Sequence, residues 1–211
     1  MTTGTSRQGT HETSREHINV LRAAKVQQEQ RRRRRIRFAS VGATIAVIAI
    51  VVAMMLTSRQ ESSSVMRVAP DFTLTDTSGT QVSLAGLRGK NVLLYFSEGA
   101  GCQACLVQMA QIEKDPSFAS EGLTVLPIVM NSKDQITADM VANDVRTPFL
   151  LDDGTVSTAY GTIGKGMHAD LPGHSFVLID KAGNQRWYGE YPSMFLSPTD
   201  LLKEINNHLA S

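Results

Sequence analysis

The chain has 211 residues, 42% of them hydrophobic, a formal net charge of +1 and two cysteines. The small net charge hides two opposite regions, because residues 1–37 carry ten Lys/Arg and three Asp/Glu, whereas residues 65–211 carry ten and sixteen. The 147 residues from Val65 onward are enough for one domain with a hydrophobic core. The acidic charge of this part gives no reason to expect nucleic-acid binding.

Residues 38–57 are an uncharged and mostly apolar stretch. Twenty residues in a helix span about 30 Å, the thickness of the bilayer's hydrocarbon core, so this stretch predicts a transmembrane helix. A cleaved signal peptide fits less well, because the apolar region is long and no clear A-x-A site ends it. A buried core helix is the other alternative.

Arginines set the predicted orientation of this span. Arg31–Arg35 and Arg37 precede it, and only Arg59 and Arg67 follow it closely. The positive-inside rule therefore places the N-terminus in the cytoplasm and the bulk of the chain outside. We expect a single-pass protein of the cell membrane, and an attraction of the basic residues to anionic lipid.

These features divide the chain into four parts. Residues 1–37 are expected to be a basic, mostly disordered cytoplasmic tail, and residues 38–57 the membrane helix. Residues 58–68 read as a flexible linker. Residues 69–211 form the predicted extracytoplasmic domain.

The domain opens with a hairpin signal, because Phe72–Leu74 and Gln81–Leu84 flank the turn-rich segment 75–79. Val92–Phe96 is a continuous apolar run, typical of a strand that is buried on both faces. Leu123–Met130 looks like a further strand. Pro127 inside it is expected to mark a bulge or an early strand end, since proline cannot donate to a ladder.

Helical periodicity begins at Cys102. The apolar side chains of Cys102, Cys105, Leu106, Met109 and Ile112 recur at helical spacing. Asp115-Pro116 is expected to end this helix, because proline disfavours helix in the residue before it.

In the C-terminal part of the chain, predicted helices again alternate with predicted strands. Asp134 is expected to cap a helix with Ile136, Met140 and Val141 on one face. Ser197 is expected to cap the last helix, with proline in its first turn and an acid three residues after the cap. Between them, the sequence predicts a short apolar run at 149–151, a helix at 156–160, a strand at 176–179 and a strand at 185–188. Strands that alternate with helices favour a layered α/β domain.

Cys102-Gln103-Ala104-Cys105 contains both cysteines of the chain. At a helix N-terminus, unpaired N–H groups and the helix dipole favour the thiolate of Cys102, which is the nucleophilic form. Cys105 lies one turn later on the same face and is therefore placed to resolve a mixed disulfide. A purely structural disulfide is the alternative, but so short a loop removes little entropy from the unfolded chain.

The chain resembles the redoxin branch of the thioredoxin-like superfamily, which contains membrane-anchored thiol–disulfide oxidoreductases and the AhpC/TSA antioxidant proteins. The residues that carry the resemblance are Ala69–Leu74, Gly79, Leu84–Lys90, Val92–Phe96, Cys102–Cys105, Thr147–Asp152, Ala159–Gly161 and Phe176–Asp180 with Gly183. It implies a thioredoxin-like α/β fold, with a central mixed sheet flanked by helices. It also implies that Cys102 and Cys105 form a redox-active disulfide and that no other cofactor is needed.

The chain departs from the family pattern at three places. Gly101 stands where oxidoreductases of this branch often have tryptophan. Gly173 stands at the position of the family's cis-proline, with Pro172 one residue earlier as the nearest equivalent. The peroxidase pattern P-x-x-x-[TS]-x-x-C, counted back from Cys102, meets Tyr95 and Gly99 instead of proline and threonine.

The candidates for supporting roles are Glu98, Pro172, Gly173 and His174. Glu98 is placed to accept or relay a proton for Cys105, although a solvated loop carboxylate is an equally good interpretation. His174, next to the Pro172–Gly173 pair, is interpreted either as a loop histidine near the active site, hydrogen-bonded to backbone, or as a neighbour of Cys102. If it lies beside Cys102, its positive form would lower the thiol pKa.

A metal site is the alternative use of the same residues. Cys102 and Cys105, together with His174 or His168, offer ligands that suit copper or zinc. Copper-delivery proteins of the cytochrome-oxidase assembly type share the fold and an anchor, but their cysteines usually have three residues between them, not two.

We therefore expect a membrane-anchored, extracytoplasmic thiol–disulfide oxidoreductase. Its expected partners are a membrane or extracytoplasmic thiol–disulfide electron donor, exported protein thiols or disulfides as substrates, and membrane lipid. A thiol-dependent peroxidase and a copper-binding assembly factor are the two alternatives.

Overall fold

The computed structural model describes residues 48, 61–63 and 66–210. The chain divides into two compact units, Met1–Arg59 and Gln60–Ser211, and the description below concerns the second. The predicted tail and membrane helix lie outside the described residues, apart from Ile48. Within the described part, no helix is long and apolar enough to cross a membrane.

A mixed nine-stranded sheet forms the centre of the domain, with the order β1-β9-β8-β5-β6-β7-β3-β4, and β2 also pairs with β9. The central strand β5 runs parallel to β6 and antiparallel to β8. The strands are β1 (Glu61–Ser63), β2 (Arg67–Val68), β3 (Thr73–Asp76), β4 (Gln81–Ser83), β5 (Asn91–Phe96), β6 (Leu123–Val129), β7 (Leu150–Leu151), β8 (Ser175–Ile179) and β9 (Asn184–Glu190).

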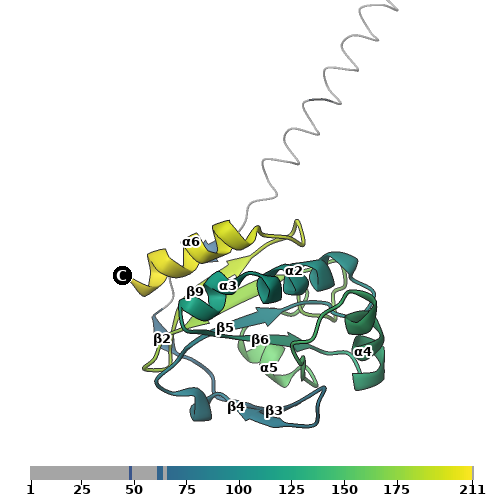
Figure 1. Cartoon of the computed structure of the whole chain (residues 1–211), viewed down its shortest axis with the longest axis horizontal. Helices are drawn as coiled ribbons and strands as arrows, with labels where there is room; N and C mark the ends of the chain where they lie inside the picture. Colours follow the sequence, from purple (N-terminus) through teal and green to yellow (C-terminus); the bar gives the residue numbers. More distant parts are fainter. Residues whose placement is uncertain (1–47, 49–60, 64–65, 211) are drawn as a thin grey trace, which may run out of the picture. The chain divides into compact units, whose positions relative to one another are not determined.

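Helices cover both faces of this sheet. They are the short 3₁₀ helix η1 (Ala85–Leu87) and the α-helices α2 (Gln103–Lys114), α3 (Pro116–Ser120), α4 (Lys133–Ala142), α5 (Thr155–Ala159) and α6 (Pro198–Leu209). Figure 1 shows α2, α3 and α6 on one side of β5 and β6, and α5 on the other. The mixed sheet flanked by helices is the architecture that the sequence predicts.

Successive side chains of β5 point to opposite faces of the sheet and therefore contribute to two separate hydrophobic cores. Leu93 and Tyr95 point into a cluster with residues of α2, α4 and α6, while Leu94 and Phe96 point into a second cluster with α5. Every residue of β5 after Asn91 is buried, as expected of a strand with both faces covered. The first cluster lies beneath the N-terminus of α2, where both cysteines are.

Two expectations about strands are wrong. The linker predicted at 58–68 contains β1 and β2, because the outer edge of β9 pairs with this extended segment. Strand β6 also runs straight through Pro127. The Ile128 carbonyl accepts from the Ser97 N–H on the β5 side, so the Pro127 nitrogen faces the other side, where pairing with β7 starts only at Ile128. No ladder hydrogen bond is therefore lost.

The helix starts are partly as predicted. Ser197 caps α6, and Asp115 ends α2 and caps α3. Ser132, not Asp134, caps α4, since its side chain and that of Gln135 form a reciprocal capping box.

The expected apolar face of α4 is also partly wrong. Ile136 and Met140 are buried, whereas Val141 is 77% exposed. Val141 follows Met140 directly, and neighbouring residues lie about 100° apart around a helix. The hairpin of β3 and β4 is confirmed, with Thr73 opposite Ser83.

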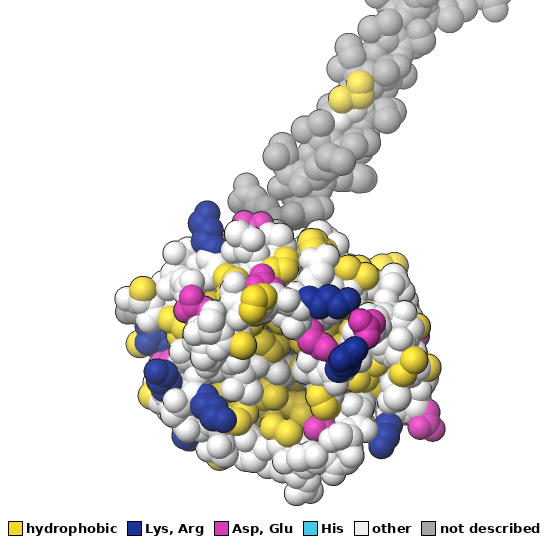
Figure 2. All heavy atoms as spheres, viewed as in Figure 1, with side chains coloured by type: hydrophobic (Ala, Val, Ile, Leu, Met, Phe, Trp, Pro, Cys, Tyr) yellow, Lys and Arg dark blue, Asp and Glu magenta, His cyan; other side chains and the backbone are white. Residues whose placement is uncertain are grey.

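Charged side chains are interspersed on the surface. On the face that Figure 2 shows, several basic groups lie toward the lower left, acidic groups are scattered, and hydrophobic side chains lie in the lower middle.

Candidate active site

The two cysteines form a disulfide at the N-terminus of α2, with their Cα atoms 5.3 Å apart. Cys102 is the N-cap residue, and its Sγ accepts a hydrogen bond of 3.3 Å from the Cys105 N–H. Cys102 is partly exposed, whereas Cys105 is 1% exposed and belongs to the core cluster. Only Cys102 is therefore open to a large partner.

The same geometry bears on the reduced form. A sulfur that already accepts an N–H at the helix N-cap is the atom on which that N–H and the helix dipole stabilise negative charge. A thiolate is the attacking species in thiol–disulfide exchange. The arrangement thus favours Cys102 as the nucleophile and leaves Cys105, buried one turn later, as the resolving thiol.

Two side chains from distant elements fix the loop that joins β5 to α2. The Asn131 Oδ1 accepts from the Ala100 N–H at 2.9 Å, and the Asp139 Oδ2 accepts from the Gly101 N–H at 2.7 Å. Gly101 has a φ of +85°, a conformation that side chains other than glycine rarely adopt. This conformation explains why glycine stands where related oxidoreductases often have tryptophan.

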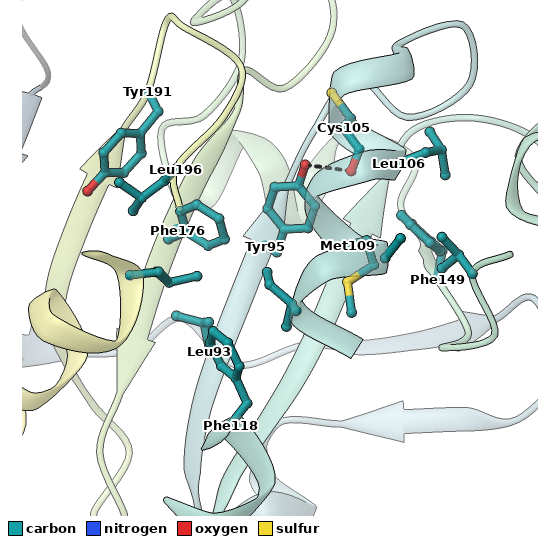
Figure 3. Close-up of a cluster of buried hydrophobic side chains, with 14 of the residues drawn as sticks. Leu93, Tyr95, Cys105, Leu106, Met109, Phe118, Phe149, Phe176, Tyr191 and Leu196 are labelled. Atoms are coloured by element: carbon teal, nitrogen blue, oxygen red, sulfur yellow. Dashed lines mark hydrogen bonds between the residues drawn. The ribbon is translucent and has the colours of Figure 1, made fainter. Parts of the chain in front are cut away.

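Tyr95 contacts Cys105 and also links it to His174. The Tyr95 hydroxyl is 3.1 Å from the Cys105 carbonyl oxygen, the contact drawn in Figure 3, and 3.2 Å from the Nδ1 of His174. His174 is fully buried, and desolvation lowers its pKa to about 3. The prediction that a positive His174 lowers the thiol pKa is therefore wrong, because the imidazole is neutral at neutral pH.

Glu98 has a different role from the one predicted. Glu98 is 3% exposed, so its carboxylate is not a solvated loop group. Its Oε1 accepts from the N–H groups of Met167 and His168, the latter at 3.0 Å, and its Oε2 lies 2.9 Å from the His168 Nδ1. Both oxygens thus clamp the segment around Met167 against the loop before Cys102, which leaves neither free as a proton relay for Cys105 in this arrangement.

The Pro172–Gly173 pair also departs from the family pattern for a physical reason. The described residues contain no cis peptide bond, so the bond before Pro172 is trans. The Gly173 N–H donates to the Thr162 carbonyl at 2.9 Å. A Cβ on Gly173 would lie 2.3 Å from the Lys165 carbonyl carbon. Proline at this position would therefore lose a hydrogen bond and clash with the Lys165 backbone.

The alternative metal site is not assembled. Among the described residues, no group of three His, Cys, Asp or Glu side chains lies close enough to hold a metal ion. Cys102 and Cys105 are bonded to each other, His174 contacts Tyr95, and His168 contacts Glu98.

Sequence reasoning missed Tyr95, Asn131 and Asp139 as parts of this site. Tyr95 sits in an apolar run and reads as core, and only its hydroxyl contacts distinguish it. Asn131 and Asp139 are 29 and 37 residues from Cys102, and nothing in their local sequence links them to it.

The family follows from the sequence as a whole. A model of the AhpC/TSA family matches residues 65–187. The chain belongs to the AhpC/TSA family. The Cys-x-x-Cys motif of this AhpC/TSA protein, residues 102–105, lies inside the matched region.

Relatives of this AhpC/TSA protein include two kinds of enzyme. A candidate peroxiredoxin of Mycobacterium tuberculosis is 34% identical over 99 residues, which cover 46% of this chain and 63% of the relative, so the match spans less than two thirds of that protein. The thiol–disulfide oxidoreductase ResA of Bacillus cereus is 29% identical over 129 residues, which cover 60% of this chain and 69% of ResA.

Solved structures agree on the fold. AhpC of Enterococcus faecalis superposes with a TM-score of 0.61 at 14% identity, covering 69% of this chain and 92% of AhpC. The thioredoxin domain of a thiol–disulfide oxidoreductase from Bacteroides vulgatus gives a TM-score of 0.54 at 22% identity, covering 69% and 98%. The predicted thioredoxin-like fold and the redoxin branch are both confirmed.

Proposed function

We propose that this protein is a thiol–disulfide oxidoreductase in which Cys102 attacks and Cys105 resolves. The observation that carries the proposal is the disulfide between a partly exposed N-cap sulfur and a buried sulfur one turn later. The first position suits a reactive thiolate, and the second is shielded from external disulfides.

The proposed cycle has two exchanges. First, the Cys102 thiolate attacks one sulfur of a substrate disulfide, a mixed disulfide forms, and the other substrate sulfur leaves and takes a proton. Cys105 then loses its proton and attacks the Cys102 Sγ. The Cys102–Cys105 bond forms, and the second substrate sulfur leaves and is protonated. Two electrons have passed to the substrate, and an external dithiol must reduce the enzyme again.

A peroxidase activity is the second candidate, because the relatives include peroxiredoxins. A peroxide needs donors placed to stabilise its departing oxygen. The two positions at which the peroxidase pattern has proline and threonine are Tyr95 and Gly99 here, and the Tyr95 hydroxyl already donates to the Cys105 carbonyl. Because its proton is already used, this hydroxyl is not available as a donor to the departing oxygen of a peroxide, which supports disulfide exchange over peroxide reduction.

The anchor and the location are part of the proposal. The apolar stretch 38–57 and the arginines before it support a single membrane span with the redox domain outside the cytoplasm. In that setting the electron donor would be a membrane or extracytoplasmic thiol–disulfide protein, and the substrates would be exported proteins. Protease added to spheroplasts should digest the redox domain, and protease added to intact inverted membrane vesicles should not. The opposite pattern would contradict this orientation.

The activity is tested with the full-length chain and its two single-cysteine variants. We expect the wild type to catalyse insulin reduction by dithiothreitol, and Cys102→Ser to lose at least about a hundredfold of that rate, because the nucleophile is gone. Ser193→Ala, a change to an exposed hydroxyl far from the cysteines in sequence, is the control. Full activity in Cys102→Ser would contradict the proposal, and turnover of hydrogen peroxide faster than of insulin would favour the peroxidase.

A further inference from the structure

Beneath the cysteine pair lies a buried imidazole whose second nitrogen has no use in the cycle above. His174 is fully buried, and its Nε2 has no hydrogen-bond partner among the described residues. A buried acceptor without a donor is costly, and such atoms are rare in folded proteins. The Nε2 of His174 therefore calls for a donor that another state of the protein supplies.

The hydrogen bonds of Tyr95 determine which nitrogen of His174 carries the proton. The carbonyl oxygen of Cys105 only accepts, so the Tyr95 hydroxyl donates its single proton there, at 3.1 Å. At 3.2 Å from His174 Nδ1, the same hydroxyl oxygen can then only accept. The proton of the neutral imidazole is thus on Nδ1, and Nε2 presents a lone pair.

Sheet geometry places this lone pair on the face that carries Cys105. The register of β5 and β8 pairs Tyr95 with Phe176 and Phe96 with Ser175. Continuing this register by one residue sets Ser97 opposite His174. Side chains two residues apart in a strand share a face, so Ser97 lies on the face of Tyr95, and His174 on the face of Phe176. Tyr95 and Phe176 belong to the same core cluster as Cys105. Ser97 Oγ is likewise buried and without a partner. An unpaired hydroxyl, which can donate or accept, and an unpaired ring nitrogen thus share the layer beneath the resolving sulfur.

We propose that reduced Cys105 donates its S–H to the Nε2 of His174, so that Tyr95 and His174 act as positioning residues that stabilise the reduced form of the pair. Reduction of the disulfide is the event that creates the donor, since a disulfide sulfur has no proton. This inference rests on the proposed exchange activity and adds to it a determinant of the equilibrium between the two forms.

The equilibrium can be written with glutathione as the probe. Two glutathione thiols give up two electrons and two protons and join as one disulfide, while the Cys102–Cys105 bond breaks and each enzyme sulfur gains one proton. A hydrogen bond that exists only in the dithiol favours the reduced side. Replacing His174 by leucine removes the acceptor, so we expect the equilibrium constant for reduction to fall about fivefold or more.

The test measures this equilibrium constant for the full-length protein in glutathione buffers. Free thiols are alkylated, and mass spectrometry gives the ratio of reduced to oxidised protein. His174→Leu and Tyr95→Phe should both be harder to reduce than the wild type, and His174→Gln, which keeps an acceptor oxygen, should lie closer to it. Tyr160→Phe is the matched control, because the Tyr160 hydroxyl also donates to a backbone carbonyl, that of Pro70, but on the other face of the sheet. Tyr160→Phe should leave the constant unchanged.

The outcomes separate the two proposals. If the wild type exchanges with glutathione but His174→Leu and Tyr95→Phe both match it, the role of His174 is wrong and the exchange function stands. If Tyr160→Phe shifts the constant as much as Tyr95→Phe, the effect is general loosening of the fold, which also contradicts the inference. A wild-type pair that never exchanges with thiols contradicts both proposals.

Discussion

The clamp formed by Glu98 gives the sharpest prediction about stability. In Glu98→Ala, the N–H groups of Met167 and His168 lose a carboxylate acceptor, and the His168 ring loses its partner. A hydrogen bond to a charged group contributes about 1.5–3 kcal/mol. Two backbone bonds at the low end amount to about 3 kcal/mol, and relief of burying the carboxylate offsets part of this. We therefore expect a loss of about 2 kcal/mol in the free energy of unfolding.

Urea denaturation followed by the fluorescence of Trp187, the only tryptophan of the chain, measures this loss. Glu121→Ala is the control, since Glu121 is an exposed glutamate that should change the stability by less than about 0.5 kcal/mol. Limited proteolysis should also cut Glu98→Ala faster near Met167. If Glu98→Ala and Glu121→Ala unfold at the same urea concentration, the carboxylate does not hold this segment and the reasoning is refuted.

Two further predictions concern Gly173 and His174. Gly173→Ala should cost about 2 kcal/mol, because its Cβ would lie 2.3 Å from a backbone carbon, whereas Gly86→Ala meets no atom within 4 Å and should be nearly neutral in the same denaturation experiment. His174 titrates near 6.5 when unfolded and at about 3 when folded, so the unfolded state binds more protons between these values. Its contribution to stability is complete above pH 6.5 and is lost as the pH falls toward 3. From pH 6 to pH 4, wild type should therefore lose up to about 1.4 kcal/mol per pH unit more than His174→Gln, and parallel stability curves would contradict the burial of a neutral imidazole.

Local patterns were enough to predict the sheet-and-helix framework. The unbroken apolar run at 92–96 indicates a doubly covered strand, and Ser197-Pro198 indicates a helix start, because each signal depends only on neighbouring residues. Pro127 misled the prediction since its effect depends on which side of the strand its nitrogen faces. That side is set by the register with β5 and β7, which a single strand does not reveal.

The candidate site was predictable only where the chemistry is local. Cys102 and Cys105 are recognisable from their spacing, and the helix that begins after Cys102 indicates Cys102 as the nucleophile. The roles of Glu98 and His174 depend on burial and on partners about 70 to 80 residues away, Met167 and His168 for the first and Tyr95 for the second. Burial turned the expected positive histidine into a neutral one, and the expected proton relay into a clamp.

The most direct test of the central claim is to trap the mixed disulfide. Full-length Cys105→Ser and Cys102→Ser proteins are each incubated with an insulin-derived disulfide peptide, and the products are separated without reducing agent and identified by mass spectrometry. We predict a stable adduct through Cys102 in Cys105→Ser, because the resolving thiol is missing. Cys102→Ser should form almost none, since Cys105 is 1% exposed. Equal adducts in the two variants, or an adduct only through Cys105, would contradict the assignment of Cys102 as the attacking thiol.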